Sequence, residues 1–194
     1  MIKSIGRFQG TLPESDFDKI LRDVAEFPDR IKVLRLYKDG EPLVNKRLPS
    51  MIRSAKETGL FETIDTTTNA GLLTHDKSEA IIDAGLDLIN ISIDGLDADQ
   101  FKHFAKAKID FAKFVDEIAY LHEISGDCLI VVKTTREIIG THREQEFLDT
   151  FGDISDRIYV ENTSPCWPDF DVEERMGIEI STGLYGNEIV DQTA

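Results

Sequence analysis

Apolar residues recur along the chain with two alternating periods. Residues 14–27 place apolar side chains at intervals of three and four, which predicts an amphipathic helix. Residues 31–37, I-K-V-L-R-L-Y, alternate between apolar and polar positions, as a half-buried strand does. Residues 48–58 are again helical in pattern and end before Gly59, a residue type that commonly terminates helices. The first part of the chain therefore predicts helix, strand and helix.

The same order recurs downstream. Strands are predicted over residues 63–67, 86–93, 128–134 and 157–161. Helices are predicted over residues 76–84, 98–104, 111–124 and 144–151, the first of them capped by Thr74. Strands that alternate with helices predict an α/β fold with a parallel sheet and right-handed crossovers.

From Asn162 the pattern changes. The run N-T-S-P-C-W-P-D-F-D contains two prolines and several acids and has no clear period, which predicts a loop. We therefore expect one α/β domain over residues 1–165, and an exit segment or the start of a further domain over residues 166–194.

Charge narrows the set of partners. The net charge of -15, from 37 acidic and 22 basic residues, repels nucleic-acid phosphates and anionic lipids. The chain has no apolar run long enough to cross a membrane, and its first residues lack the apolar region of a secretory signal. We expect a cytoplasmic protein that binds neither nucleic acid nor membrane and acts on a small molecule or a peptide.

Cysteine and histidine offer little chemistry of their own. Cys128 and Cys166 are too few for a disulfide framework, and Cys128 stands in an apolar run that predicts a buried strand. The four histidines fall in or beside predicted helices and loops without metal-ligand spacing, so we expect surface positions for them: His75, His103, His122 and His142.

Polar residues follow the predicted strands where each strand ends. These segments read D-G-E-P (39–42), T-T-N-A-G (67–71), S-I-D-G (92–95), K-T-T-R (133–136) and E-N (161–162). Ligands of parallel α/β proteins bind outside the carboxyl ends of the strands. A ring of such donors, acceptors and one cation suits a zwitterionic ligand that carries a ribose.

Four of these segments carry a family resemblance. The run G-E-P-L-V-N-K (40–46) resembles the "GGE" element of radical S-adenosylmethionine (radical SAM) enzymes, with Asp39 where many members have glycine. T-T-N-A-G, I-S-I-D-G and V-K-T-T follow in the family's order, and the resemblance covers roughly residues 10–165. It implies a partial (β/α) barrel with parallel strands, truncated relative to the family's six-stranded core.

The resemblance also implies eight positions that bind SAM. They are Gly40 and Glu41 at the methionine ammonium, Thr68 and Asn69 at the ribose or methionine, Ser92 and Asp94 near the ribose, Lys133 at the methionine carboxylate, and Glu161 at the ligand or the substrate. Each position has an ordinary alternative. Gly40 to Pro42 and Asn69 to Gly71 can be simple turns, Ser92 can satisfy the sheet, and Lys133 can be a surface lysine.

The chemistry of the family requires a group that this sequence does not hold. A [4Fe-4S] cluster is bound in the family by three thiolates of a C-x-x-x-C-x-x-C loop, and two cysteines 38 positions apart cannot form that loop. We expect a fragment truncated at both ends, of the kind followed by a cysteine-rich SPASM-type domain, that does not generate the 5′-deoxyadenosyl radical by itself.

Three interpretations remain open. The first is the core of a radical SAM enzyme, of oxidoreductase or transferase type, that acts by hydrogen-atom abstraction. The second is a non-catalytic, degenerate barrel that binds a nucleotide-like ligand or serves as a scaffold. The third, an aldolase-like or phosphate-binding barrel, depends on Lys133 alone, because no glycine-rich phosphate loop is present.

Overall fold

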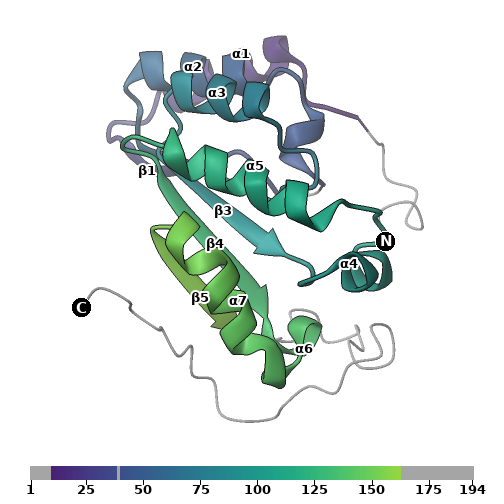
Figure 1. Cartoon of the computed structure of the whole chain (residues 1–194). Helices are drawn as coiled ribbons and strands as arrows, with labels where there is room; N and C mark the ends of the chain where they lie inside the picture. The colour runs from purple at the N-terminus through teal and green to yellow at the C-terminus, as the bar shows by residue number, and fades with distance from the viewer. Residues whose placement is uncertain (1–9, 39, 163–194) are drawn as a thin grey trace, which may run out of the picture.

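Five parallel strands form one sheet in the order in which they occur along the chain (Figure 1). The computed structural model describes residues 10–38 and 40–162. The strands are β1 (Ile31–Arg35), β2 (Phe61–Thr68), β3 (Leu88–Ile93), β4 (Leu129–Thr135) and β5 (Arg157–Glu161). Because all four strand pairs are parallel, the carboxyl ends of the strands lie at the same edge of the sheet. We call this edge the rim.

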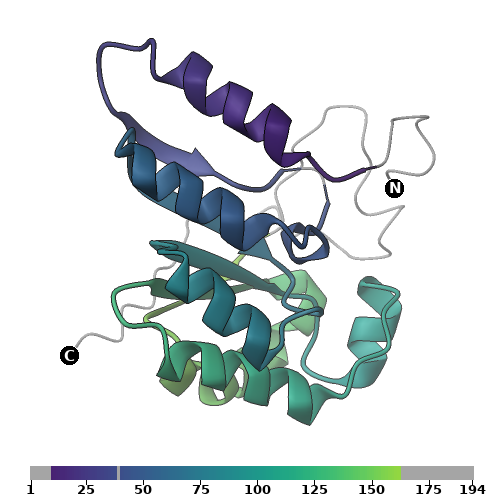
Figure 2. The ribbon, with the colours of Figure 1, turned by 90° about the horizontal axis from the view of Figure 1, so that it is seen from above.

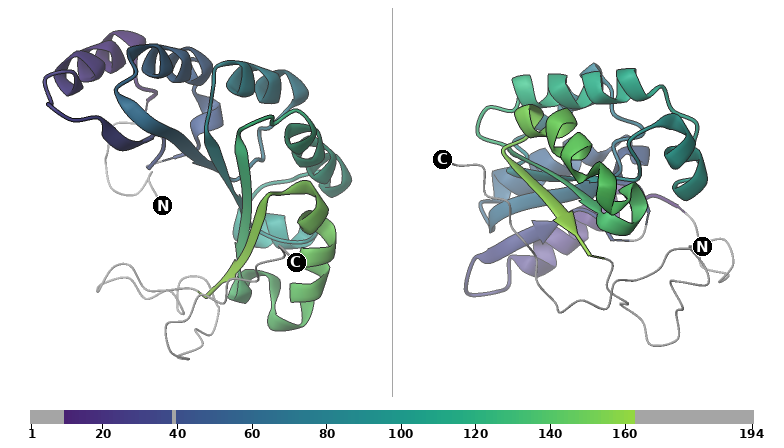
Figure 3. Two further views of the ribbon diagram at one scale, coloured as in Figure 1. Left: turned by 90° about the vertical axis from the view of Figure 1, so that its left-hand side faces the viewer. Right: turned by 60° about the horizontal axis from the view of Figure 1, so that its bottom comes forward.

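Helices connect the strands and lie on one side of the sheet. They are α1 (Glu14–Val24), α2 (Leu48–Thr58), α3 (His75–Asp83), α4 (Ala98–Phe104), α5 (Phe111–Glu123), α6 (Arg136–Ile139) and α7 (Glu144–Phe151). Short 3-10 turns are η2 (Pro42–Val44), η3 (Thr141–Arg143) and η4 (Gly152–Ile154). In Figures 2 and 3 the helices follow the outer side of a curved sheet, and no described helix covers its inner side. This arrangement is an arc of a (β/α) barrel.

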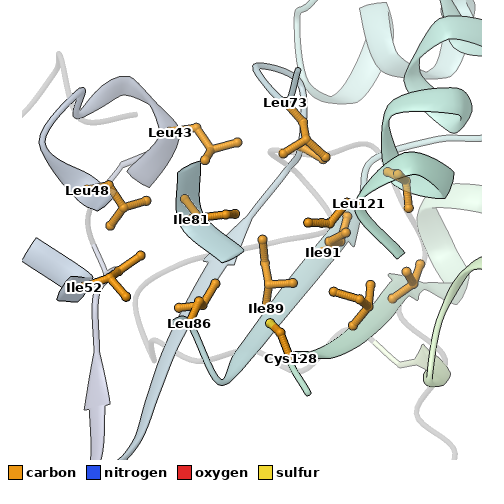
Figure 4. Packing of buried hydrophobic residues seen from close by; sticks show 14 of the residues in the cluster. Leu43, Leu48, Ile52, Leu73, Ile81, Leu86, Ile89, Ile91, Leu121 and Cys128 are labelled. Carbon is orange, nitrogen blue, oxygen red and sulfur yellow. The ribbon is translucent and has the colours of Figure 1, made fainter. Parts of the chain in front are cut away.

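The core fills the space between the sheet and the helices (Figure 4). In β3 every second residue is buried, so Ile89, Ile91 and Ile93 face the helices while the residues between them face the inner side. Ile52 of α2 and Leu121 of α5 are fully buried against this face. The helix-facing side of β3 is therefore apolar, and Asn90 and Ser92 lie on its inner side.

The predicted elements are confirmed in type and order, with differences at their ends. The first helix stops at Val24, three residues short of the prediction, because Pro28 disfavours a helical residue before it. The first strand stops at Arg35 rather than residue 37. The turn η2 and the short helix α6 were not predicted, since four residues or fewer show no period.

The fold class is confirmed as α/β with parallel strands in a partial barrel. The expected boundary between residues 165 and 166 lies outside the described residues. Within the described ranges, no helix has the length and apolar character needed to span a membrane.

Candidate functional site at the strand rim

The carboxylate of Glu41 joins the first two strand ends. It accepts hydrogen bonds from the Leu43 amide (3.0 Å), the Thr68 hydroxyl (2.6 Å) and the Asn69 amide (3.0 Å). Two bonds reach 27 and 28 residues along the chain, from the loop after β1 to the end of β2. The same carboxylate caps η2, so one side chain shapes both loops. We call this arrangement the Glu41 clasp.

The turn after β2 is fixed by its own side chains. The Thr68 hydroxyl, besides donating to Glu41, accepts from the Ala70 amide (2.9 Å), and the Asn69 side-chain oxygen accepts from the Gly71 amide (3.0 Å). Ala70 takes a left-handed φ of 55°, which is uncommon for a residue with a Cβ. The turn is thus held in one conformation by four hydrogen bonds, counting the Asn69 amide to Glu41.

Gly40 opens one wall of the rim. Its φ of 107° lies in a region that side-chain-bearing residues avoid, and a Cβ placed there would meet no heavy atom within 4 Å. Gly40 and Glu41 line a cavity of about 430 Å³ that continues over Tyr37 and the α1 residue Phe17. The glycine therefore leaves the backbone of the loop accessible from this cavity.

The third and fourth strands bring Ser92 and Lys133 together. They are register partners in adjacent strands, so both side chains leave the sheet on the same, inner face. The Lys133 ammonium lies 3.1 Å from Glu161 at the end of β5. The side chains of this ion pair are 32% and 37% exposed, a setting in which such a pair contributes about 1 kcal/mol or less to stability. The ion pair therefore positions Lys133 at the rim only weakly, and the ammonium group can exchange Glu161 for another anion.

Asp94 follows β3 directly and is half-buried. Burial raises the pKa of its carboxyl above the ordinary value, and the negative charge of Glu41 raises it further. In the described part of the chain the Asp94 side chain has no hydrogen-bond or ion-pair partner. A desolvated acceptor with no partner is available to a donor group of a ligand.

The eight residues singled out from the sequence all lie at the rim. The strand register and the Glu41 clasp link Glu41 to Asn69 and Ser92 to Lys133, while Asp94 is near enough to feel the charge of Glu41. The Thr68 side chain is buried, with the residue 2% exposed, and its hydroxyl has two protein partners. Asn69 and Glu41 also stabilise the loops through hydrogen bonds to backbone amides.

Sequence reasoning missed polar residues on the inner face below the rim. The Asp65 carboxylate on β2 is buried and lies 3.4 Å from the Arg35 guanidinium of its register partner on β1. Burial raises the Asp65 pKa, and the Arg35 charge lowers it in part. Tyr159 is the register partner of Lys133 on the other side. The sequence signalled Asp65 only as a polar residue within a predicted strand. Solvent-exposed strand positions give the same signal, so it could not identify a buried carboxylate.

The donor set fits SAM and does not fit the iron-sulfur cluster. Carboxylate, hydroxyl and ammonium groups at the rim match the ammonium, ribose and carboxylate of SAM. In residues 10–38 and 40–162, no three His, Cys, Asp or Glu side chains lie close enough together to hold a metal ion. Cys128 is buried and burial raises its thiol pKa to about 12, so it is a core residue as expected. Cys166 lies outside the described residues.

Proteins of known activity share part of this sequence. GTP 3′,8-cyclases from Clostridium perfringens and Alkaliphilus metalliredigens are both 33% identical to it, over 133 and 141 residues. These matches cover 68% and 73% of this chain but only 39% and 42% of the relatives. The chain thus spans about two fifths of the length of these curated relatives.

A solved structure shares the fold. The structure of TYW1 with a lysine-pyruvate adduct bound superposes with a TM-score of 0.60 over 84% of this chain and 58% of that one, at 17% identity. The family model of the radical SAM superfamily matches residues 2–154, which include every strand but β5. The match spans most of the chain, and the fold and the order of the strand-end motifs agree with it. The chain therefore belongs to the radical SAM superfamily.

Proposed function

We propose that this chain forms the SAM-binding wall of a radical SAM enzyme that acts by hydrogen-atom abstraction. The proposal is supported most by two neighbour relations at the rim: Asp94 is close enough to Glu41 to feel its charge, and Lys133 is the register partner of Ser92. Bound SAM supplies the 5′-deoxyadenosyl group whose radical removes a hydrogen atom from the substrate. The residues of this chain bind and orient the ligand.

Each rim group has a separate task in this proposal. The Gly40 backbone and the remaining acceptor capacity of Glu41 face the methionine ammonium, and Lys133 pairs with the methionine carboxylate. Ser92 and Asp94 meet the ribose hydroxyls, for which the unpartnered Asp94 carboxylate is a ready acceptor. Lys133 exchanges an exposed ion pair with Glu161 for one with the ligand, an exchange of about 1 kcal/mol or less on the protein side.

Isothermal titration of the chain with SAM tests this assignment. We expect Asp94→Asn to weaken SAM binding by about tenfold or more, because a hydrogen bond to a charged acceptor contributes about 1.5–3 kcal/mol. Asp99→Asn on the exposed surface of α4 removes the same charge five residues away and should leave the affinity unchanged. No SAM binding, or equal affinity for the Asp94 and Asp99 variants, would contradict the proposal.

Catalysis needs thiolates that the described residues do not provide. We therefore infer that the chain is inactive by itself and that radical formation requires a cluster loop from elsewhere in the full-length protein. Anaerobic reconstitution of that protein with iron and sulfide, followed by measurement of 5′-deoxyadenosine, tests this inference. Release of 5′-deoxyadenosine by the 194-residue chain alone would show that the inference is wrong.

The relatives suggest a substrate class for the full-length protein. Because the matched relatives are named GTP 3′,8-cyclases, we propose GTP as the first substrate to test. Besides Lys133, which the proposal assigns to the carboxylate of SAM, the inner face offers the cation of Arg157 on β5 to a triphosphate. Consumption of GTP but not ATP by the reconstituted enzyme would support this substrate.

A non-catalytic barrel is the second candidate. The buried Cys128 favours it, since the one cysteine of the described ranges serves the core rather than a metal. SAM binding by a full-length protein that takes up no iron would support this candidate over the enzyme.

A further inference from the structure

A second cavity lies outside the rim site. It measures about 370 Å³ and opens where the loop before α3 meets the start of α5. None of the eight rim residues discussed above lines it. Helices α3 and α5 pack side by side along the outer layer (Figures 1 and 2), so the cavity belongs to that layer.

The floor of the cavity is apolar and rigid. Ala70, Leu73 and Phe114 line it and are buried. The Phe114 ring packs edge-on against Phe101 at a centroid distance of 5.0 Å and beside Phe111 at 6.1 Å. A flat apolar group can therefore rest on a surface that neighbouring rings already hold in place.

The walls of the cavity are cationic. Three lysines line it, Lys77, Lys108 and Lys113, together with the acids Asp110 and Glu117. Both acids have partners in the protein: Asp110 accepts from the Lys113 amide (3.2 Å) as the cap of α5, and Glu117 lies 2.9 Å from the His75 ring nitrogen.

Only one of the three lysine ammonium groups has hydrogen-bond partners within the described part of the protein. The Lys77 ammonium donates to the carbonyl oxygens of Leu72 (2.8 Å) and Leu43 (3.3 Å). In the described ranges the ammonium groups of Lys108 and Lys113 have no hydrogen-bond or ion-pair partner. The chain has 37 acidic and 22 basic residues, so acids outnumber bases, yet these two lysines beside a cavity remain unpaired. The charge of this surface is the reverse of the charge of the chain.

We propose that this cavity binds an organic phosphate monoester. Its apolar ring lies on the floor formed by Ala70, Leu73 and Phe114, and its phosphate lies between Lys108 and Lys113 at the start of α5. Phosphate is favoured over a carboxylate because a dianion gains from both ammonium groups. The lining of this cavity includes none of the eight residues assigned to SAM at the rim.

Titration of the chain with phenyl phosphate tests the proposal. This probe has the ring and the phosphate and nothing that resembles SAM. We expect a Kd of about 1–5 mM from its eleven or so heavy atoms. Inorganic phosphate, which lacks the ring, and benzoate, which has a single charge, should each bind about tenfold more weakly.

Matched double variants locate the binding. Lys108→Gln with Lys113→Gln should weaken phenyl phosphate binding about tenfold or more. Lys102→Gln with Lys106→Gln makes the same change of charge on exposed lysines of the neighbouring α4 region and should leave the affinity within about twofold. Circular dichroism of all variants checks that they fold, which is expected because the four side chains are exposed.

The other outcomes overturn the proposal. Equal losses in the two double variants would show a general charge effect, and no binding by the wild-type chain below about 10 mM would exclude the ligand class. A loss of binding in Ser92→Ala would place the probe at the rim instead of this cavity.

Discussion

The Glu41 carboxylate accepts three hydrogen bonds at the rim. Its two carboxylate oxygens accept from two backbone amides and one hydroxyl, and these bonds hold the loops that precede α2 and α3. A carboxylate with three donors still has acceptor capacity for one more. The residue can therefore organise the site and face a ligand at once.

Replacing Glu41 removes the hydrogen bonds that join these loops. We expect Glu41→Ala to lower the free energy of unfolding by about 2–3 kcal/mol, because it removes three hydrogen bonds to a charged acceptor and leaves two amides unpaired. Glu62→Ala is the control, since that glutamate is exposed on β2. Urea denaturation measures both, and equal stabilities would show that the clasp contributes nothing.

Asp94 and Asp97, three residues apart, should respond to pH with opposite signs. The Asp94 pKa lies above the ordinary 3.8, so its ionised form is disfavoured in the fold and its stabilising contribution is lost as pH rises through the folded pKa. The Asp97 pKa lies below 3.8, because the Gln100 amide and Arg143 hold its charged form, so its contribution is lost as pH falls.

Thermal unfolding of two variants between acid and neutral pH checks these signs. Asp94→Asn should be more stable than the wild type at neutral pH and equal to it in acid. Asp97→Asn should be less stable at neutral pH, with the difference vanishing in acid. The same sign for both variants at neutral pH would contradict the assignment.

At the scale of elements, carboxylates fix where strands begin. Asp87 accepts from the Ile64 amide of β2 (2.7 Å) and Asp156 accepts from the Ile130 amide of β4 (2.7 Å). Each aspartate precedes a strand by one residue and binds the neighbouring strand. These bonds set the start of a strand relative to its neighbour, and so the height at which its polar end reaches the rim.

Gly95 permits the close approach of α4 to the end of β3. A Cβ at this position would lie 2.5 Å from the Gln100 Cβ and 3.0 Å from the Phe101 nitrogen. We expect Gly95→Ala to cost about 2–3 kcal/mol of unfolding free energy, because backbone must move. Gly59→Ala, which has open space and a φ of 64°, should cost about 1 kcal/mol. Urea denaturation decides between them, and a smaller loss at Gly95 would exclude the clash.

At the scale of the molecule, the helical layer protects one face of the sheet only. Cys128 lies on the protected side, where burial raises the pKa of its thiol to about 12. A thiol in this state is a poor nucleophile and a poor metal ligand. The thiol of Cys128 therefore takes no part in the polar chemistry of the inner face and its rim.

Thiol labelling measures this protection. In a Cys166→Ser background, we expect Cys128 to react with iodoacetamide at pH 8 only through unfolding, so the rate should rise steeply with urea. Labelling without denaturant at the rate of a free thiol would show that the core is open at β4.

The sequence predicted more of the fold than of the site. Residues 144–151 and 157–161 were predicted to their final limits, because apolar spacing and local charge suffice to define such elements. The rim was predicted because carboxyl ends of parallel strands meet at one edge. The partners were not: Thr68 binding Glu41 and Lys133 binding Glu161 join residues 27 and 28 positions apart, and no local pattern encodes such distances.

The sequence by itself determined the order of strands and helices, the apolar face of each, and the polar segments at the strand ends, because these depend on the period of apolar residues and on turn chemistry. Only the tertiary structure decided which polar groups are used inside the protein and which remain for a ligand. The physical reason is that hydrogen-bond partners, burial and charge depend on neighbours in space. Spatial neighbours occupy the Thr68 hydroxyl, while the Asp94 carboxylate has no partner among the described residues. The fold also places two unpaired lysines beside a cavity that no sequence motif predicted.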